Sequence, residues 1–165
     1  MISRLQSNAV TKAKQLDLWV QLMQDRFSGF YISLTEPYSL FKNAEIKREL
    51  NESFISALCE HLRDRKLGDW LSREEKSIFL FYRFPIGTWA EKVHAWAVKT
   101  GKINSIESAY SIVHGDDSSG EVFAEIPHEI LINALKALEL QGKCELVMSY
   151  RGETDITKIG VKFFH

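Results

Sequence analysis

The same order of predicted elements occurs twice along this chain of 165 residues. Hydrophobic residues at helical spacing and short aromatic or β-branched runs define the first set. In order, it comprises a helix capped by Thr11 that runs to Phe27, a strand over 30–34, a helix over 43–50, a helix from the cap Asn51 to near Gly68, and a hairpin of 69–71 with 78–84. This set is helix, short strand, helix, helix and hairpin.

The second half of the chain predicts the same set again. In order, it comprises a helix capped by Thr88 and ended by Gly101, an extended piece over 103–106, a helix over 107–113, a helix opened by Pro127 and ended by Gly142, and a hairpin of 145–148 with 158–164. This order is the plan of a winged helix. We therefore predict an α+β, mostly α fold: two tandem winged-helix domains, residues 1–86 and 87–165, each with three helices and a β-hairpin.

The two halves can be aligned at a fixed offset, at which Lys66 falls on Lys143. The final strands also correspond, at a larger spacing, with Ile78, Leu80 and Tyr82 matching Ile159, Val161 and Phe163. We expect these residues to form the buried face of each hairpin.

Phe79 and Phe81 lie on the opposite face of the first hairpin in this alignment. Exposed aromatic residues on a sheet are candidates for contact with a partner protein. The alternative, that both rings pack against the other domain, is equally compatible with the sequence.

The charges divide unequally between the two halves. The whole chain has 21 basic and 22 acidic residues and a net charge of -1, but residues 1–86 carry 13 and 11 (+2) and residues 87–165 carry 8 and 11 (-3). A winged helix often binds DNA through its third helix, so DNA binding is the alternative function. The second domain is too acidic for that role. In the first, Arg63, Arg65 and Lys66 crowd the last helical turn, where cations also stabilise the helix dipole.

An acidic stretch over 115–129 has no lysine or arginine. One interpretation is a solvated, flexible loop. The other is a docking edge for a basic helix, with Asp116, Asp117 and Glu121 attracting it and Phe123, together with Ile126, as apolar anchors.

The sequence does not favour an enzyme, a cofactor or a metal site. Cys59 and His61 are two residues apart on a helix and point to different faces, and Cys59 lies on the apolar stripe. The five histidines lack the spacing of a metal motif. No signal peptide and no apolar run of about 20 residues is found, so we expect a cytoplasmic protein that meets membranes only through partners.

Several segments, in this order and spacing, resemble the small subunit of the ESCRT-II complex, of the vacuolar protein sorting 25 type. They are Leu5–Asn8, Lys14–Leu16 with Trp19, Leu40–Asn43, Trp89, Trp96, Gly101, Asn104, Tyr110, Gly115, Phe123, Leu131–Leu138 and Gly160–Phe164. The resemblance implies a tandem winged-helix subunit that is not catalytic and binds no nucleic acid. It further implies that the first winged helix docks onto the larger ESCRT-II subunits, with two copies of the chain in each complex.

For the second winged helix, the resemblance implies binding to the first helix of the ESCRT-III subunit that nucleates assembly on endosomal membrane. The pathway sorts ubiquitinated cargo into multivesicular bodies, so peripheral recruitment to endosomes is expected. The chain departs from the family at Met1–Arg4, where relatives carry a proline- and aromatic-rich anchor; a shortened chain and a lineage without the anchor both stay open. The acidic loop also departs from the family, because Ser118 and Ser119 lie between its acids and make it less densely acidic.

Overall fold

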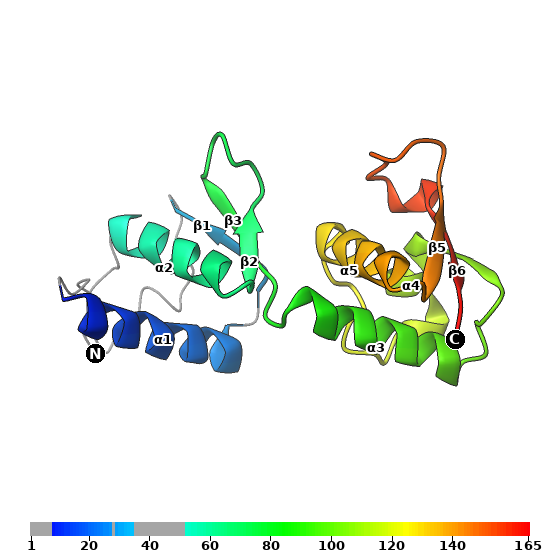
Figure 1. Ribbon diagram of the computed structural model, residues 1–165, viewed down its shortest axis with the longest axis horizontal. Coiled ribbons are helices and arrows are strands. Elements are labelled where there is room, and N and C mark those ends of the chain that lie inside the picture. The colour runs from blue at the N-terminus through cyan, green and yellow to red at the C-terminus, as the bar shows by residue number, and fades with distance from the viewer. Residues whose placement is uncertain (1–7, 28, 35–51) are drawn as a thin grey trace. The chain divides into compact units, whose positions relative to one another are not determined.

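The computed structural model describes residues 8–27, 29–34 and 52–165, and the chain divides into two compact units. The first unit is residues 1–83 and the second is residues 84–165, so the division falls between Arg83 and Phe84 rather than after residue 86. The predicted helix over 43–50 and its neighbour Asn51 lie outside the described residues. Figure 1 shows the helices and strands of both units.

The described elements of the first unit are two helices and three strands: α1 (Ala9–Arg26), β1 (Tyr31–Ser33), α2 (Glu52–Asp64), β2 (Gly68–Trp70) and β3 (Ile78–Phe81). The three strands form an antiparallel sheet in the order β1-β3-β2, and α1 packs beside α2 (Figure 1). Trp19 of α1 meets Phe54 of α2 edge-on, with ring centroids 5.8 Å apart. The buried aromatic and aliphatic residues of these elements form one core.

The N-cap of the first helix is Asn8, three residues before the predicted cap Thr11. The side chain of Asn8 accepts hydrogen bonds from the backbone N–H groups of Val10 (3.0 Å) and Thr11 (3.1 Å). The prediction that Thr11 caps this helix is therefore wrong. Asparagine caps more strongly than threonine because its short carbonyl reaches two of the otherwise unpaired N–H groups.

The second unit has the predicted order of elements: α3 (Ile86–Lys99), β4 (Ile106–Ser108), α4 (Ala109–His114), the 3-10 turn η1 (Asp116–Ser118), α5 (His128–Leu140), β5 (Cys144–Val147), the 3-10 turn η2 (Ile156–Lys158) and β6 (Gly160–Phe163). Its sheet has the order β4-β6-β5, all antiparallel. The fold class is thereby confirmed. Pro85, and not Thr88, is the N-cap of α3.

The predicted buried face of the second hairpin is confirmed, and the hydrophobic side of α5 is buried with it. The α5 stripe, Ile130, Leu131, Ala134, Leu135 and Leu138, is buried, as are Ile159, Val161 and Phe163 of the hairpin. Trp96 of α3 packs edge-on against Phe163, with centroids 6.5 Å apart. On β5, the backbone N–H of Leu146 donates to Glu139 Oε2 of α5 at 2.9 Å, and Arg151 donates to Glu139 Oε1 at 3.0 Å.

The duplication is real in the structure, but its predicted offset is wrong by one residue. Each helix before the hairpin closes with the same hydrogen bond, from Leu67 N–H to Leu62 O and from Lys143 N–H to Leu138 O. Lys66 (φ 60°) and Gly142 (φ 72°) supply the left-handed residue. Lys66 therefore corresponds to Gly142 and not to Lys143.

Gly68 has a different role from the predicted helix stop. It begins β2, and a Cβ atom there would lie 2.3 Å from the Phe79 ring and 2.5 Å from the Leu80 carbonyl oxygen. The residue is therefore glycine because the neighbouring strand approaches closely.

Candidate functional site

The two aromatic residues predicted to face a partner in the first unit are inaccessible. Phe79 and Phe81 are 0% exposed and belong to the core of the first unit, where Phe79 meets Trp70 edge-on at 5.1 Å and Phe81 meets Phe27 at 5.8 Å. The register explains the error, because Phe81 pairs with Gly68 as Phe163 pairs with Cys144. A shift of one residue moves every side chain of a strand to the other face.

Of the three hairpin residues expected to be buried, Leu80 and Tyr82 are buried (3% and 9% exposed) and Ile78 is not; Tyr31 of β1 and Leu71, about which the sequence made no prediction, are also exposed. Ile78 is 39% exposed, Tyr31 37% and Leu71 43%. Tyr31 pairs with Leu80, and Leu71 donates to Ile78 O, so these side chains share the face opposite the core. We call Tyr31, Leu71, Ile78 and Leu80 the outer face of the first sheet.

The acidic loop of the second unit is folded onto its core. Phe123 is 0% exposed and packs edge-on against Trp96 at 5.8 Å, and Ile126 and Ser118 are also buried. Phe123 and Ile126 therefore anchor the loop within its own unit, and the prediction that they meet a partner was wrong. Val122, one residue earlier, is 53% exposed.

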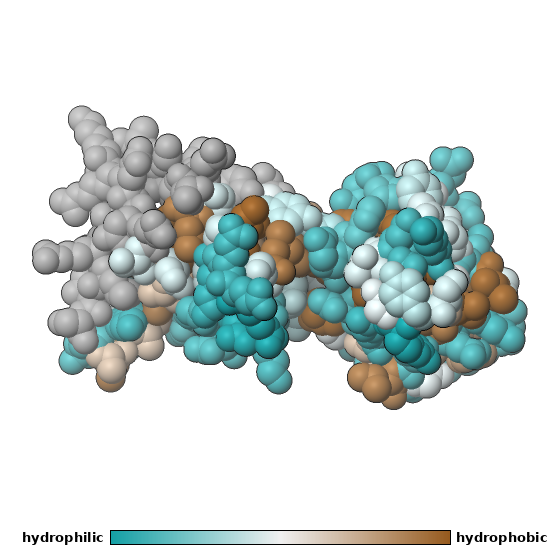
Figure 2. Space-filling model, turned by 90° about the horizontal axis from the view of Figure 1, so that it is seen from above, coloured by the Kyte–Doolittle hydropathy of each residue, from teal (hydrophilic) through white to brown (hydrophobic). Residues whose placement is uncertain are grey.

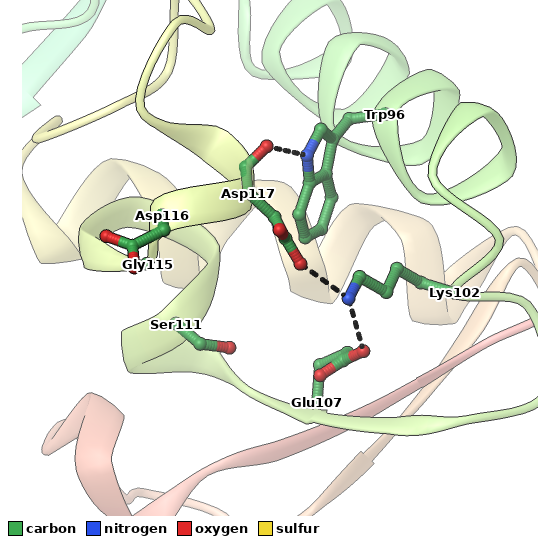
Figure 3. A pocket seen from close by; sticks show the side chains of 7 residues that line it. All are labelled: Trp96, Lys102, Glu107, Ser111, Gly115, Asp116 and Asp117. Carbon is green, nitrogen blue, oxygen red and sulfur yellow. Dashed lines mark hydrogen bonds and ion pairs between the residues drawn. The ribbon is translucent and has the colours of Figure 1, made fainter.

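A pocket of about 290 Å³ opens between this loop, α3 and α4 (Figure 3). It is lined by Trp96, Lys102, Glu107, Ser111, Gly115, Asp116 and Asp117. Trp96 Nε1 donates to the backbone oxygen of Asp117 at 3.1 Å, which fixes the loop against α3. A Cβ atom at Gly115 would lie 2.4 Å from Ser111 O, so glycine allows the loop to leave α4 there.

Lys102 lies between two carboxylates of the pocket. Its Nζ atom is 2.8 Å from Asp117 Oδ2 and 3.4 Å from Glu107 Oε1 (Figure 3). The hydrogen bond to Asp117 raises the pKa of Lys102, with the charges of Glu107 and Asp117 adding to the effect. Lys102 is therefore a cation that holds Asp117 in place. Sequence reasoning missed it because 15 residues separate the partners.

The three acidic residues predicted to attract a partner are not equivalent. Asp117 is paired with Lys102, and Glu121 is 3.7 Å from Lys99. Asp116 is exposed, its carboxylate is turned away from Lys102 in Figure 3, and no side chain of residues 8–27, 29–34 or 52–165 pairs with it. Asp116 is thus the acidic group of the pocket that is open to a cation from outside.

Two of the three basic residues near the end of α2 are paired with acids of the same unit. Arg63 Nε is 3.2 Å from Asp69, and Arg65 NH1 is 2.6 Å from Asp17, which also contacts His61 at 2.7 Å. Such pairing neutralises the charges that a phosphate backbone would require. The geometry therefore does not favour the DNA-binding alternative.

Both cysteines are buried, and burial is the main reason that the pKa of each thiol is raised, to about 12 for Cys144. A raised pKa leaves little thiolate for nucleophilic chemistry.

Within the described part of the chain, no three His, Cys, Asp or Glu side chains gather as metal ligands. Nor does a described helix have the length and hydropathy to cross a membrane. On the face of the second unit that Figure 2 shows, hydrophobic residues form separate small groups among hydrophilic ones.

The elements and their two sheets define a tandem winged-helix protein. The chain belongs to the ESCRT-II complex subunit family, whose model matches residues 4–127. It is 30% identical to vacuolar protein-sorting-associated protein 25 of Danio rerio and 28% identical to that of Homo sapiens; each match covers 97% of this chain, and 91% and 90% of the relative.

Solved structures confirm the fold. Subunit VPS25 of the endosomal trafficking complex ESCRT-II superimposes with a TM-score of 0.81 at 18% identity, covering 98% of this chain and 92% of the other. A chain of the endosomal complex ESCRT-II (VPS22/VPS25/VPS36) gives 0.79 at 18% identity, covering 98% and 93%. The resemblance drawn from the sequence is therefore correct.

Proposed function

We propose that this chain is the small, non-catalytic subunit of an ESCRT-II endosomal sorting complex and links its core to ESCRT-III. The first unit attaches to the larger subunits, with two copies of the chain in each complex. The second unit binds the first helix of the nucleating ESCRT-III subunit, in the sorting of ubiquitinated cargo into multivesicular bodies. The chain itself is cytoplasmic and reaches endosomal membrane through these partners. Membership of the family supports this proposal.

The open carboxylate of Asp116 is the observation that carries the assignment of the second unit. The pocket contains three acids, Glu107, Asp116 and Asp117, and one base, Lys102, so its lining has a net charge of -2. The second unit as a whole is acidic, with 8 basic and 11 acidic residues over 87–165. A basic side chain on a partner helix complements this charge and would be oriented by it.

The partner helix also needs apolar contact, because charge pairs at an exposed rim contribute little affinity. Val122, exposed beside Glu121, can supply it. Phe123 acts indirectly, since its buried ring holds the loop against Trp96. In this proposal Asp116 contacts a basic side chain of the partner. Asp117 and Glu121 contribute to the negative electrostatic potential of the loop and, through their ion pairs, to its shape.

For the first unit, the candidate contact with a partner is the outer face of the first sheet, in place of the buried Phe79 and Phe81. Three large side chains are exposed there, next to Leu80 in the central strand. Apolar residues at the centre of an obligate interface are the usual source of its stability. This face is therefore where we place the contact with the larger subunits.

The assignment of the second unit is tested by titrating the ESCRT-III helix, as a peptide, into the wild-type chain and Asp116→Lys at two salt concentrations. We expect about tenfold weaker binding at low salt and a smaller loss at high salt, because ions screen an exposed pair. Glu91→Lys, the same charge change on the exposed side of α3, is the matched control. Equal affinity for wild type and Asp116→Lys at both salt concentrations would sink the assignment.

A separate measurement addresses the DNA-binding alternative. The wild-type chain is mixed with a generic duplex in a mobility-shift assay at low salt. We expect no complex, because Arg63 and Arg65 are paired within the unit. Tight binding that falls steeply with salt would contradict the proposal.

A further inference from the structure

Two histidines that the docking proposal does not use lie together on the second unit. His114 is the last residue of α4 and His128 is the first residue of α5, and their Nε2 atoms are 3.1 Å apart. At that distance one nitrogen donates a proton and the other accepts it, because two protonated or two unprotonated nitrogens would repel. The two rings therefore converge on a single proton.

The orientation of His114 is set by a carboxylate. Its Nδ1 atom is 2.9 Å from Glu125 Oε2, and an ionised carboxylate only accepts, so Nδ1 carries the proton. In the neutral ring, the lone pair of His114 then lies on Nε2, facing His128. A histidine that binds a metal almost always donates its other ring N–H in this way, which fixes the tautomer and raises its basicity.

Other contacts hold this arrangement in place. The Tyr110 ring lies 4.7 Å from the His114 ring. Glu125 has a left-handed backbone (φ 62°), and its N–H donates to Val113 O at 3.0 Å. The left-handed region is disfavoured for a residue with a Cβ atom, so local contacts maintain this conformation. His128, exposed at the start of its helix, can turn more freely than His114.

The separation of the nitrogens is close to that of two ligands on one ion. With Zn–N bonds of about 2.0–2.1 Å and tetrahedral angles, two nitrogens lie about 3.3 Å apart. The pair therefore needs to open by about 0.2 Å, with a rotation of the exposed His128 ring. Imidazole ligands suit Zn²⁺, Cu²⁺ and Ni²⁺, whereas Mg²⁺ and Ca²⁺ prefer oxygen.

We propose that His114 and His128 form a surface site for a divalent transition-metal ion of the zinc type, which replaces their shared proton. Glu125 orients His114, and water fills the remaining positions, since no third ligand side chain joins the pair among the described residues. The bound ion joins the end of α4 to the start of α5 and so closes the base of the loop 115–127. This site is independent of the proposed docking function.

The test is a calorimetric titration of ZnCl₂ into the full, untagged chain, with MgCl₂ as the comparison ion. We expect one Zn²⁺ per chain and no Mg²⁺ binding. His128→Gln abolishes the binding, and Glu125→Gln weakens it about tenfold, because removal of an orienting carboxylate typically costs 10–100-fold in metal affinity. His165→Gln is the matched control, since that exposed histidine lies at the end of the chain.

Thermal unfolding of the same proteins provides a second readout. Zn²⁺ raises the Tm of the wild type and of His165→Gln, because a ligand that binds only the folded state stabilises it. It leaves the Tm of His128→Gln unchanged, and equal Tm values in EDTA show that the variant is folded. Wild-type chain without saturable Zn²⁺ binding, or His128→Gln that binds as the wild type does, would overturn the proposal.

Discussion

The two units share one framework and differ most on the outer faces of their sheets. Aligned by their strand pairs, Tyr31 and Leu71 of the first sheet correspond to Ile106 and Val147 of the second. In the central strand, however, Ile78 and Leu80 correspond to Gly160 and Lys162. On this face the central strand is therefore apolar in the first sheet and polar or bare in the second, while both edge strands carry an acid and a serine: Asp69 and Ser33 in the first sheet, Glu145 and Ser108 in the second.

The difference shows how two copies of one fold can present different surfaces. The core side of each sheet must match its helices, so Phe81 and Phe163 occupy equivalent positions and are both buried. The outer side carries no such constraint. The first unit has an apolar central strand there, and the second has an acid-lined pocket elsewhere, between its loop and α3.

The equivalence of the two core phenylalanines is tested by Phe81→Ala and Phe163→Ala. Each should lower the free energy of unfolding of its own unit by about 3–5 kcal/mol, because a buried ring is replaced by a cavity. Amide hydrogen exchange, which reports stability region by region, assigns the loss to a unit. A loss under about 0.5 kcal/mol for Phe81→Ala would restore the idea that this ring faces outward.

One glycine in each sheet should respond differently to an added methyl group. Gly68→Ala places a Cβ atom against the Leu80 backbone oxygen and should destabilise the first unit by about 1–3 kcal/mol or more. Gly160→Ala meets the Ile106 and Val147 side chains at 3.4 and 3.5 Å and the Val147 backbone oxygen at 3.7 Å, and should change stability by less than about 1 kcal/mol. Chemical unfolding followed by the same exchange method measures both; similar effects at the two sites would break the comparison.

The proposed roles of the outer faces are separated by Ile78→Lys. A lysine at the centre of an apolar interface should weaken co-purification with the larger ESCRT-II subunits about tenfold, which is about 1.4 kcal/mol. Binding of the ESCRT-III helix should not change. Leu18→Lys, at an exposed position of α1, serves as the control. If the two variants behave alike, the outer face is not the contact.

The smallest expected effect concerns pH and the first unit alone. The hydrogen bond from His61 is the largest cause that lowers the pKa of Asp17 from 3.8, and Arg65 adds to it. A lowered folded pKa stabilises the unit above pH 3.8, and this stabilisation is lost as the pH falls through the folded value. Asp17→Asn should therefore be slightly less stable than wild type at pH 7 and equal to it near pH 2. A pH-independent difference would contradict this.

Helical periodicity allowed much of this architecture to be predicted. The α5 stripe follows the helical repeat, and Val161 and Phe163 alternate with Gly160 and Lys162, so each pattern has one consistent solution. By contrast, the run from Ile78 to Tyr82 is apolar on both faces and shows no alternation. Its register depends on the close approach at Gly68, which is visible only in the folded sheet.

The acidic loop shows a second limit of sequence reasoning. Its charges predicted a solvated segment, yet Phe123 and Ile126 are buried, because two large side chains outweigh the preference of their neighbours for water. The distinction between Asp116 and Asp117 depends on Lys102, which approaches from a different element. Contacts between elements of this kind leave no periodic signal.

The carboxylate of Glu139 has a consequence for how copies of the chain behave at high local concentration. It accepts the hydrogen bond from the Leu146 N–H, which points outward from the edge strand β5, where another strand would have to bind. An edge strand with free N–H groups is a template for aggregation, and covering them is a common protection. If a complex holds two copies of the chain, as we propose, their sheets are thereby hindered from joining edge to edge.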